Sequence, residues 1–85
     1  MNILISKKFE KMFGKCPQEI KKKFKERLRI YRNDKYSSIL NNHPLSGKMK
    51  GYRSINITGD YRAILKEKST EVIFIAIGTH SQLYK

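Results

Sequence analysis

Hydrophobic and polar positions follow two different periods along the chain, and the change of period divides the sequence. The first part has apolar residues three and four positions apart, most clearly in the stripe formed by Ile20, Phe24, Leu28 and Tyr31. This spacing places apolar side chains on one face of an α-helix. After residue 48 the period falls to about two, which is typical of β-strands with two unlike faces.

The first part predicts two helices. Ser6 is a suitable N-cap for a helix over residues 7–13, and Gly14 ends it. Pro17 begins the second helix, because proline fits the first helical position. Since only a short segment joins them, we expect an antiparallel helical hairpin. The face of the second helix opposite its apolar stripe carries Lys21, Lys22, Lys25, Arg29 and Arg32.

Strands are predicted at residues 1–5, 49–57, 60–67 and 71–78. The last of these is apolar on both faces, so we expect it to lie inside the sheet. Residues 34–48 are predicted to form a loop with one short turn. The resulting order is β-α-α-β-β-β. We therefore expect residues 1–85 to form one α+β domain, in which a small antiparallel sheet carries the helical hairpin on one face.

The helical hairpin covers one face of the predicted sheet, so the opposite face is open for function. Along residues 60–66, Arg62 alternates with Ala63 and therefore lies on the opposite face of the strand from Ala63. We expect Tyr52, Asn56, Arg62 and the residues directly after the last strand to share this open face.

The excess of basic residues indicates a negatively charged partner. The chain has 19 Lys and Arg against 7 Asp and Glu, a formal net charge of +12. Nucleic acid, an anionic membrane and an acidic protein are the candidates. No apolar stretch approaches the roughly 20 residues that span a bilayer. A single cysteine, Cys16, fits a reducing cytoplasm, and one Cys with two His predicts no metal and no cofactor.

The segment GTHSQLYK, residues 78–85, places a histidine and a tyrosine directly after the last apolar strand. With His43 and Asp60, His80 forms a set suited to metal-free RNA cleavage, in which the ribose 2′-OH attacks the adjacent phosphate. This reaction needs a base, an acid and cations near the phosphate. Histidine titrates nearest neutrality. The cations predicted to bind RNA include Lys48, Lys50 and Arg53.

Each of these residues also has a structural interpretation. His80 is explained equally well as an exposed residue after a strand, and Asp60 as a turn residue. Tyr84 could serve only to pack the end of the chain. The residues alone indicate a basic nucleic-acid-binding α+β domain and leave catalysis open.

Three stretches add a resemblance: HPLSGKMKGYR (43–53), GDYRAIL (59–65) and IGTHSQLY (77–84). Together with the order of elements they resemble the RelE/ParE superfamily of type II toxins, and within it the YafQ-like messenger-RNA endonucleases. The resemblance implies a cytoplasmic toxin that cuts messenger RNA on the ribosome and is neutralised by a cognate antitoxin, which the charge predicts to be acidic. We expect a monomer when free and a hetero-oligomer with the antitoxin.

The same resemblance implies roles for individual residues. His43 matches the histidine of the HPL segment, and His80 matches the histidine of GTH, a proton-transfer residue. Tyr84 matches a terminal aromatic near the scissile nucleotide. Asp60 matches the acid of an acidic-aromatic pair, and Arg62 matches an arginine suited to binding the phosphate.

Further positions are predicted to contact RNA, and two depart from the branch. Tyr61 stands where the branch often has tryptophan, and Asn56 where it often has histidine. Ala76 replaces an arginine, which removes a cation from the phosphate site. We expect Arg62 to substitute for it. The predicted RNA-binding set is Lys48, Lys50, Arg53, Asn56 and Tyr61.

Two alternatives stay open. A ParE-like inhibitor of DNA gyrase would share the fold, but it has no need for the two histidines. A decayed homologue would keep RNA binding and lose cleavage. The departures from the branch at Asn56 and Ala76 are compatible with this alternative.

Overall fold

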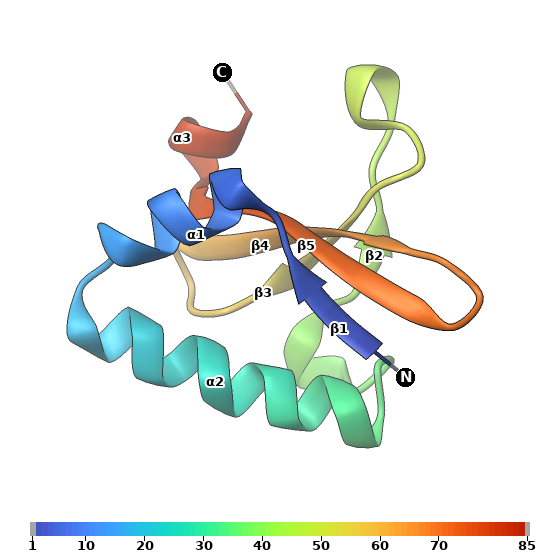
Figure 1. The fold of residues 1–85 in the computed structure, drawn as a ribbon, viewed down its shortest axis with the longest axis horizontal. Coiled ribbons are helices and arrows are strands. Elements are labelled where there is room, and N and C mark those ends of the chain that lie inside the picture. Colours follow the sequence, from blue (N-terminus) through green and yellow to red (C-terminus); the bar gives the residue numbers. More distant parts are fainter. Residues whose placement is uncertain (1, 85) are drawn as a thin grey trace.

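The computed structural model describes residues 2–84 and shows a five-stranded sheet packed with helices (Figure 1). The strands are β1 (Asn2–Ile5), β2 (His43–Pro44), β3 (Arg53–Asn56), β4 (Tyr61–Glu67) and β5 (Glu71–Thr79). The helices are α1 (Lys7–Gly14), α2 (Gln18–Asn33) and α3 (His80–Leu83), with 3-10 turns η1 (Ser38–Leu40) and η2 (Gly47–Met49). The predicted α+β class, with two helices packed on a sheet, is confirmed.

The sheet order is β1-β5-β4-β3-β2, and β5 lies inside the sheet as predicted. The pairs β2–β3, β3–β4 and β4–β5 are antiparallel, whereas β1 pairs in parallel with β5. The prediction of a purely antiparallel sheet is therefore wrong at this edge. Hairpin turns enforce antiparallel pairing between successive strands, but β1 and β5 are separated by the rest of the fold and are free to run in the same direction.

The core lies between the sheet and the two long helices. Phe9 of α1 and Phe24 of α2 both pack on Phe74 of β5, with ring centroids 5.9 Å and 5.4 Å from it. From β3 and β4, the side chains of Ile55 and Leu65 complete this core and are fully buried. We call this side of the sheet the helix face.

Ser6 fixes α1 to the sheet. Its side-chain oxygen accepts a hydrogen bond from the backbone N–H of Phe9 (3.0 Å) and donates one to the carbonyl of Ile75 (3.0 Å). The predicted N-cap is thus confirmed, and the same hydroxyl joins the helix start to β5.

The segment before β4 is less extended than predicted. The expected strand over residues 49–57 is shortened to Arg53–Asn56, because η2 and a turn occupy its first part. Gly51 has φ +96°, a conformation that residues with a side chain rarely adopt. The expected loop over 34–48 contains η1, β2 and the start of η2.

The described chain ends in a single helical turn, α3, where the sequence analysis predicted no helix after the last strand. Thr79 begins it: its side chain accepts a hydrogen bond from the backbone of Gln82 (3.3 Å), whose side chain accepts one from the backbone of Thr79 (2.8 Å). This reciprocal pair is a capping box. In Figure 1, α3 and the loop between β2 and β3 rise on the side of the sheet away from α2.

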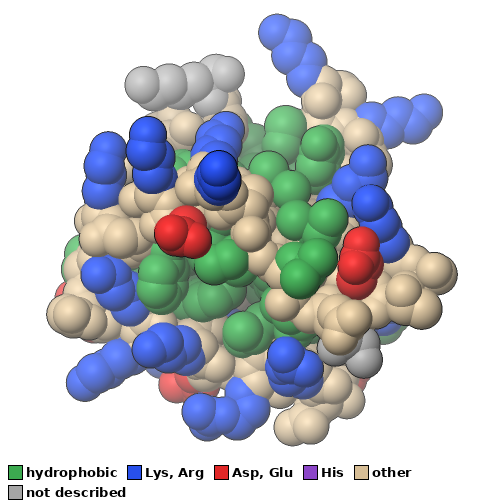
Figure 2. Space-filling view, viewed as in Figure 1, with side chains coloured by type: hydrophobic (Ala, Val, Ile, Leu, Met, Phe, Trp, Pro, Cys, Tyr) green, Lys and Arg blue, Asp and Glu red, His purple; other side chains and the backbone are tan. Residues whose placement is uncertain are grey.

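The surface is dominated by basic side chains. Figure 2 shows lysine and arginine around the rim of one face, with a hydrophobic area in its middle and few acidic side chains. Leu4 and Ile5 of β1 are among the exposed large hydrophobic residues. Among residues 2–84, no helix combines the length and the apolar character that crossing a membrane requires.

Candidate functional site

A cleft of about 320 Å³ lies on the sheet side opposite the helix face. β2 supplies His43, β4 supplies Arg62, and α3 with the residue after it supplies His80 and Tyr84. Four of the five predicted catalytic residues are therefore brought together from three separate segments. The complete lining of this cleft is Asn41, His43, Leu45, Ser54, Arg62, His80 and Tyr84.

Strand register explains why these side chains converge. Ile55 and Ile57 are buried in the core, so their neighbours Ser54 and Asn56 point to the other side of β3. Ser54 lies opposite His43 on β2, and Asn56 lies opposite Arg62 on β4. The open face expected from the alternation of residues is therefore the face that forms the cleft.

His43 is held by its own loop. Its ring Nδ1 lies 2.8 Å from the carbonyl oxygen of Asn41. Because a carbonyl only accepts, Nδ1 carries the proton in the neutral ring, and Nε2 is the nitrogen with a free lone pair. Asn41 has φ +46°, a left-handed conformation that asparagine tolerates better than most residues. This arrangement leaves Nε2 of His43 able to accept a proton.

His80 and Tyr84 form a pair across the single turn of α3. Their ring centroids are 4.7 Å apart, and the backbone N–H of Tyr84 donates to the carbonyl of His80 (3.0 Å). His80 is exposed, whereas Tyr84 is half-buried. The helical turn therefore fixes an accessible imidazole beside an aromatic ring.

The Arg62 guanidinium is bound to the turn between β3 and β4. Its Nη1 donates to the carbonyl oxygens of Gly59 (2.8 Å), Thr58 (3.1 Å) and its neighbour Tyr61 (3.3 Å). These neutral acceptors leave the positive charge of Arg62 without a carboxylate partner among the ion pairs of the described residues.

Asp60, the fifth predicted catalytic residue, does not line the cleft. It is exposed and lines an adjacent hollow of about 320 Å³ together with Tyr61, Thr79 and His80. His80 borders both spaces. Asp60 is thus a neighbour of the His80 side of the cleft.

The predicted RNA-binding residues are scattered. Lys48 and Lys50 are exposed on the loop that carries η2. Arg53 lies apart from the cleft, because its Nε donates to the side-chain oxygen of Asn42 (2.7 Å) and lies 3.8 Å from Glu67. Tyr61 packs against the core.

Sequence reasoning missed three residues of the cleft lining: Asn41, Leu45 and Ser54. Ser54 is only 1% exposed, and its hydroxyl has no hydrogen-bond partner among residues 2–84. The alternation in β3 placed Ser54 on the open face, but a serine in a strand carries no distinctive chemical pattern. The unpartnered hydroxyl is visible only in the structure.

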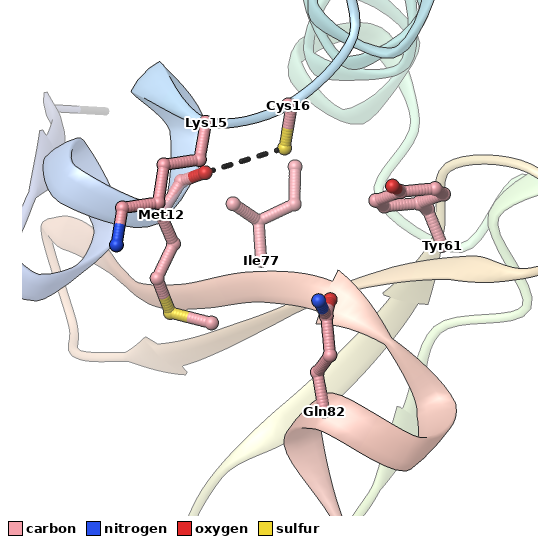
Figure 3. Close-up of a pocket in the computed structure, with 6 residues that line it drawn as sticks. All are labelled: Met12, Lys15, Cys16, Tyr61, Ile77 and Gln82. Atoms are coloured by element: carbon pink, nitrogen blue, oxygen red, sulfur yellow. Dashed lines mark hydrogen bonds between the residues drawn. The ribbon is translucent and has the colours of Figure 1, made fainter.

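A second pocket, of about 290 Å³, lies near the end of α1 and is lined by Met12, Lys15, Cys16, Tyr61, Ile77 and Gln82 (Figure 3). The Cys16 thiol donates to the carbonyl of Met12 (3.4 Å). Burial raises the pKa of this thiol, an effect that the positive charge of Lys21 partly opposes. Cys16 is therefore not activated as a nucleophile. In the described part of the chain, no three His, Cys, Asp or Glu side chains gather as a metal site would require.

Solved structures resemble the whole fold. YafQ from E. coli shares 24% identity with a TM-score of 0.86, covering 99% of this chain and 98% of that one. The toxin in the E. coli DinJ-YafQ toxin-antitoxin complex shares 25% identity with a TM-score of 0.82, covering 99% and 97%. The RelB-RelE antitoxin-toxin complex from Methanococcus jannaschii gives 22% identity and a TM-score of 0.76, covering 95% and 94%.

Family membership rests on the sequence as a whole. None of the curated proteins matches the chain. The family model described as the bacterial toxin of type II toxin-antitoxin system, YafQ, matches residues 1–85. The sequence resemblance to the RelE/ParE superfamily and its YafQ-like branch is thereby confirmed. This chain belongs to the YafQ family of bacterial type II toxins.

Proposed function

We propose that this toxin is an endonuclease that cuts messenger RNA on the ribosome, by attack of a ribose 2′-OH on the adjacent phosphate and without a metal ion. The observation that supports it is the convergence of two histidines, an arginine and a tyrosine in one cleft. The chemistry of that set matches the base, acid and cation that this reaction requires.

His43, His80 and Arg62 each take one role in this reaction. Nε2 of His43 accepts the proton of the 2′-OH as the 2′-oxygen bonds to phosphorus. The bond from phosphorus to the 5′-oxygen then breaks, and protonated His80 gives its proton to that oxygen. Arg62 stabilises the charge on the phosphoryl oxygens. The products are a 2′,3′-cyclic phosphate and a free 5′-OH.

Two more residues support the reaction. Tyr84 lies beside the His80 ring and offers an aromatic surface for a nucleobase next to the scissile bond. Asp60 borders the adjacent hollow with His80 and would orient this imidazole once RNA is bound. Lys48 and Lys50, exposed on the loop that carries η2, would bind phosphates along the strand.

The ribosome supplies the positioning that this small domain lacks. An open cleft of about 320 Å³ cannot enclose a nucleotide on every side. The net charge of +12 favours ribosomal and messenger RNA, with an affinity that falls steeply as salt rises. The site of action is therefore the cytoplasm.

The partner that silences the toxin is a cognate antitoxin. Two of the structures described above are toxin-antitoxin complexes. For this chain, the charge of +12 favours an acidic antitoxin segment that covers the basic cleft. The free toxin would be a monomer, since such a charge opposes self-association, and the inhibited form a hetero-oligomer.

The deciding experiment is cleavage of a message on programmed ribosomes, mapped by primer extension. The wild type should cut within codons, and His80→Ala should lower the rate by about 10²- to 10⁴-fold. Lys25→Ala, an exposed substitution on α2, is the matched control and should cut normally.

A single 2′-deoxy nucleotide at the cut site separates this mechanism from metal-activated water. The proposed reaction must stop there, whereas hydrolysis by water would continue. Growth arrest by the wild type and by His80→Ala, with no cuts by either, would instead favour a gyrase target. Ribosome binding without cuts by the wild type would favour the decayed homologue.

A further inference from the structure

Two buried oxygen atoms on β3 have no hydrogen-bond partner among residues 2–84: the Ser54 hydroxyl and the side-chain carbonyl Oδ1 of Asn56. Such atoms are rare, because each costs about 1–3 kcal/mol of desolvation without compensation. Both lie on the strand face opposite the core. Each of these two oxygen atoms could accept a hydrogen bond from a further donor.

Arg62 is the donor nearest to Asn56 by strand pairing. Asn56 lies directly opposite Arg62, and the residue on the other side of Arg62 is Gly78. Because glycine has no side chain, Asn56 is the only direct cross-strand neighbour whose side chain could hold Arg62. Side chains opposite each other in antiparallel strands have Cβ atoms about 4.5–5.5 Å apart.

Arg62 nevertheless bonds elsewhere. Its Nη1 donates to carbonyls of the β3–β4 turn, at Thr58 and Gly59. These bonds hold the guanidinium toward the turn, while the acceptor on Asn56 stays unused. The side chain therefore has two alternative sets of acceptors, only one of which is occupied.

We propose that Asn56 is a positioning residue that holds the Arg62 guanidinium over the cleft when an RNA phosphate occupies it. This inference rests on the proposed endonuclease function and changes the role of Asn56, which acts on Arg62 and not on RNA. In the free toxin Arg62 lies on the turn. With phosphate bound, one edge of the guanidinium binds the phosphate and an N–H of the other edge donates to Oδ1 of Asn56.

The energetics favour an exchange of the Arg62 side chain between two positions. Leaving the turn costs Arg62 its bonds to neutral carbonyls, and the gain from satisfying a buried orphan oxygen offsets part of that cost. A phosphate binds only the second position, so it shifts the population toward it. Because Oδ1 of Asn56 has no hydrogen-bond partner among residues 2–84 of the free toxin, removing it should break no hydrogen bond there and should impair only the bound state.

Kinetics on programmed ribosomes test this proposal. Asn56→Ala should lower the single-turnover cleavage rate by about 10- to 100-fold, since misplacing a group that contacts the reacting atoms by about 1 Å has effects of this size. Ribosome affinity should stay within about twofold. Asn33→Ala, on the exposed end of α2, is the matched control.

A double variant identifies the route of the effect. If Asn56 acts through Arg62, adding Asn56→Ala to Arg62→Ala should cause no further loss. The proposal is wrong if the two losses multiply, or if Asn56→Ala cuts at the normal rate.

A readout without cleavage keeps this inference separate from the proposed function. The Arg62 side-chain N–H signal, assigned by its loss in Arg62→Ala, is followed by nitrogen-15 NMR while a DNA trinucleotide is added. The signal should move in the wild type and stay near its free position in Asn56→Ala. Equal movement in the wild type and in Asn56→Ala would overturn the inference, even for a wild type that cuts nothing.

Discussion

The two faces of the sheet differ in whether their buried polar atoms have hydrogen-bond partners. On the helix face the Tyr31 hydroxyl is buried, and it donates to the Glu67 carboxylate, which also lies near Lys35 and Arg53. On the open face the buried oxygens of Ser54 and Asn56 have no partner among residues 2–84. One face is thus complete by itself, whereas the other has unused hydrogen-bonding capacity beside a cleft.

This difference separates stability from function within one small domain. Substitutions on the helix face should lower the free energy of unfolding, whereas substitutions on the open face should not destabilise the fold, and those of the proposed catalytic residues should lower the activity. Functional sites often keep such local imperfections because the rest of the fold compensates for them. Four substitutions test this separation, from the largest expected effect to the smallest.

Phe74→Ala should be the most damaging change to the helix face. Phe74 is fully buried and its ring packs against those of Phe9, Phe24 and Tyr31. Replacing such a ring with alanine costs about 3–5 kcal/mol, which approaches the whole stability of a small domain. Urea denaturation measures it. Tyr36→Ala, at a site 61% exposed, should shift the unfolding free energy by less than about 0.5 kcal/mol.

His43→Ala should have the opposite effect, with a large loss of cleavage and almost no change in stability. We expect a loss of about 10²- to 10⁴-fold in cleavage on programmed ribosomes, because Nε2 is the proposed base. The urea midpoint should hardly move, since the ring makes one bond to a neighbouring loop carbonyl. A variant that unfolds early, or cuts at the normal rate, would break the separation between the two faces.

Much of the fold was predictable from the sequence, because hydrophobic periodicity and helix caps are local properties of the chain. The apolar stripe of α2 and the Ser6 cap need only a few neighbouring residues to be recognised. Two-residue β2 and the parallel edge strand β1 depend on pairing with distant segments, which no local pattern reports. The turn α3 was too short for periodicity, although the Thr79–Gln82 spacing carries its capping signal.

The candidate site was predicted only in part, because its geometry also depends on pairing between distant strands. His43, Arg62, His80 and Tyr84 were named through the resemblance, and register then brought them into one cleft. Arg53 belongs to the same quoted stretch as His43, yet it lies apart from the cleft and bonds to Asn42. A sequence motif names residues without giving the face on which each side chain lies.

Tyr31→Phe sharpens the comparison through pH. Burial, reinforced by the hydrogen bond to Glu67 and its negative charge, raises the pKa of Tyr31 well above its usual value near 10. The folded state thus keeps a proton that the unfolded chain loses. The resulting contribution is complete below about pH 10 and is lost as pH rises above it.

The measurement is the difference in unfolding free energy between wild type and Tyr31→Phe, by urea denaturation at pH 8 and at pH 11. At pH 8 the variant should be less stable by about 1.5–3 kcal/mol, the usual value of a hydrogen bond to a charged group. At pH 11 the gap should narrow. A gap that is constant with pH would show that the hydroxyl contributes by packing alone.

Ser54→Ala is the smallest change and tests the open face most directly. The wild-type hydroxyl is buried without a partner, so its removal should stabilise the free toxin by about 1 kcal/mol or slightly less, because the small void left behind takes back part of the gain. Thermal unfolding should show a higher midpoint for Ser54→Ala. Ser54→Val, which fills the space without a hydroxyl, should raise it at least as much. If both variants are instead less stable, the hydroxyl has a hydrogen-bond partner in solution, and the open face is as complete as the helix face.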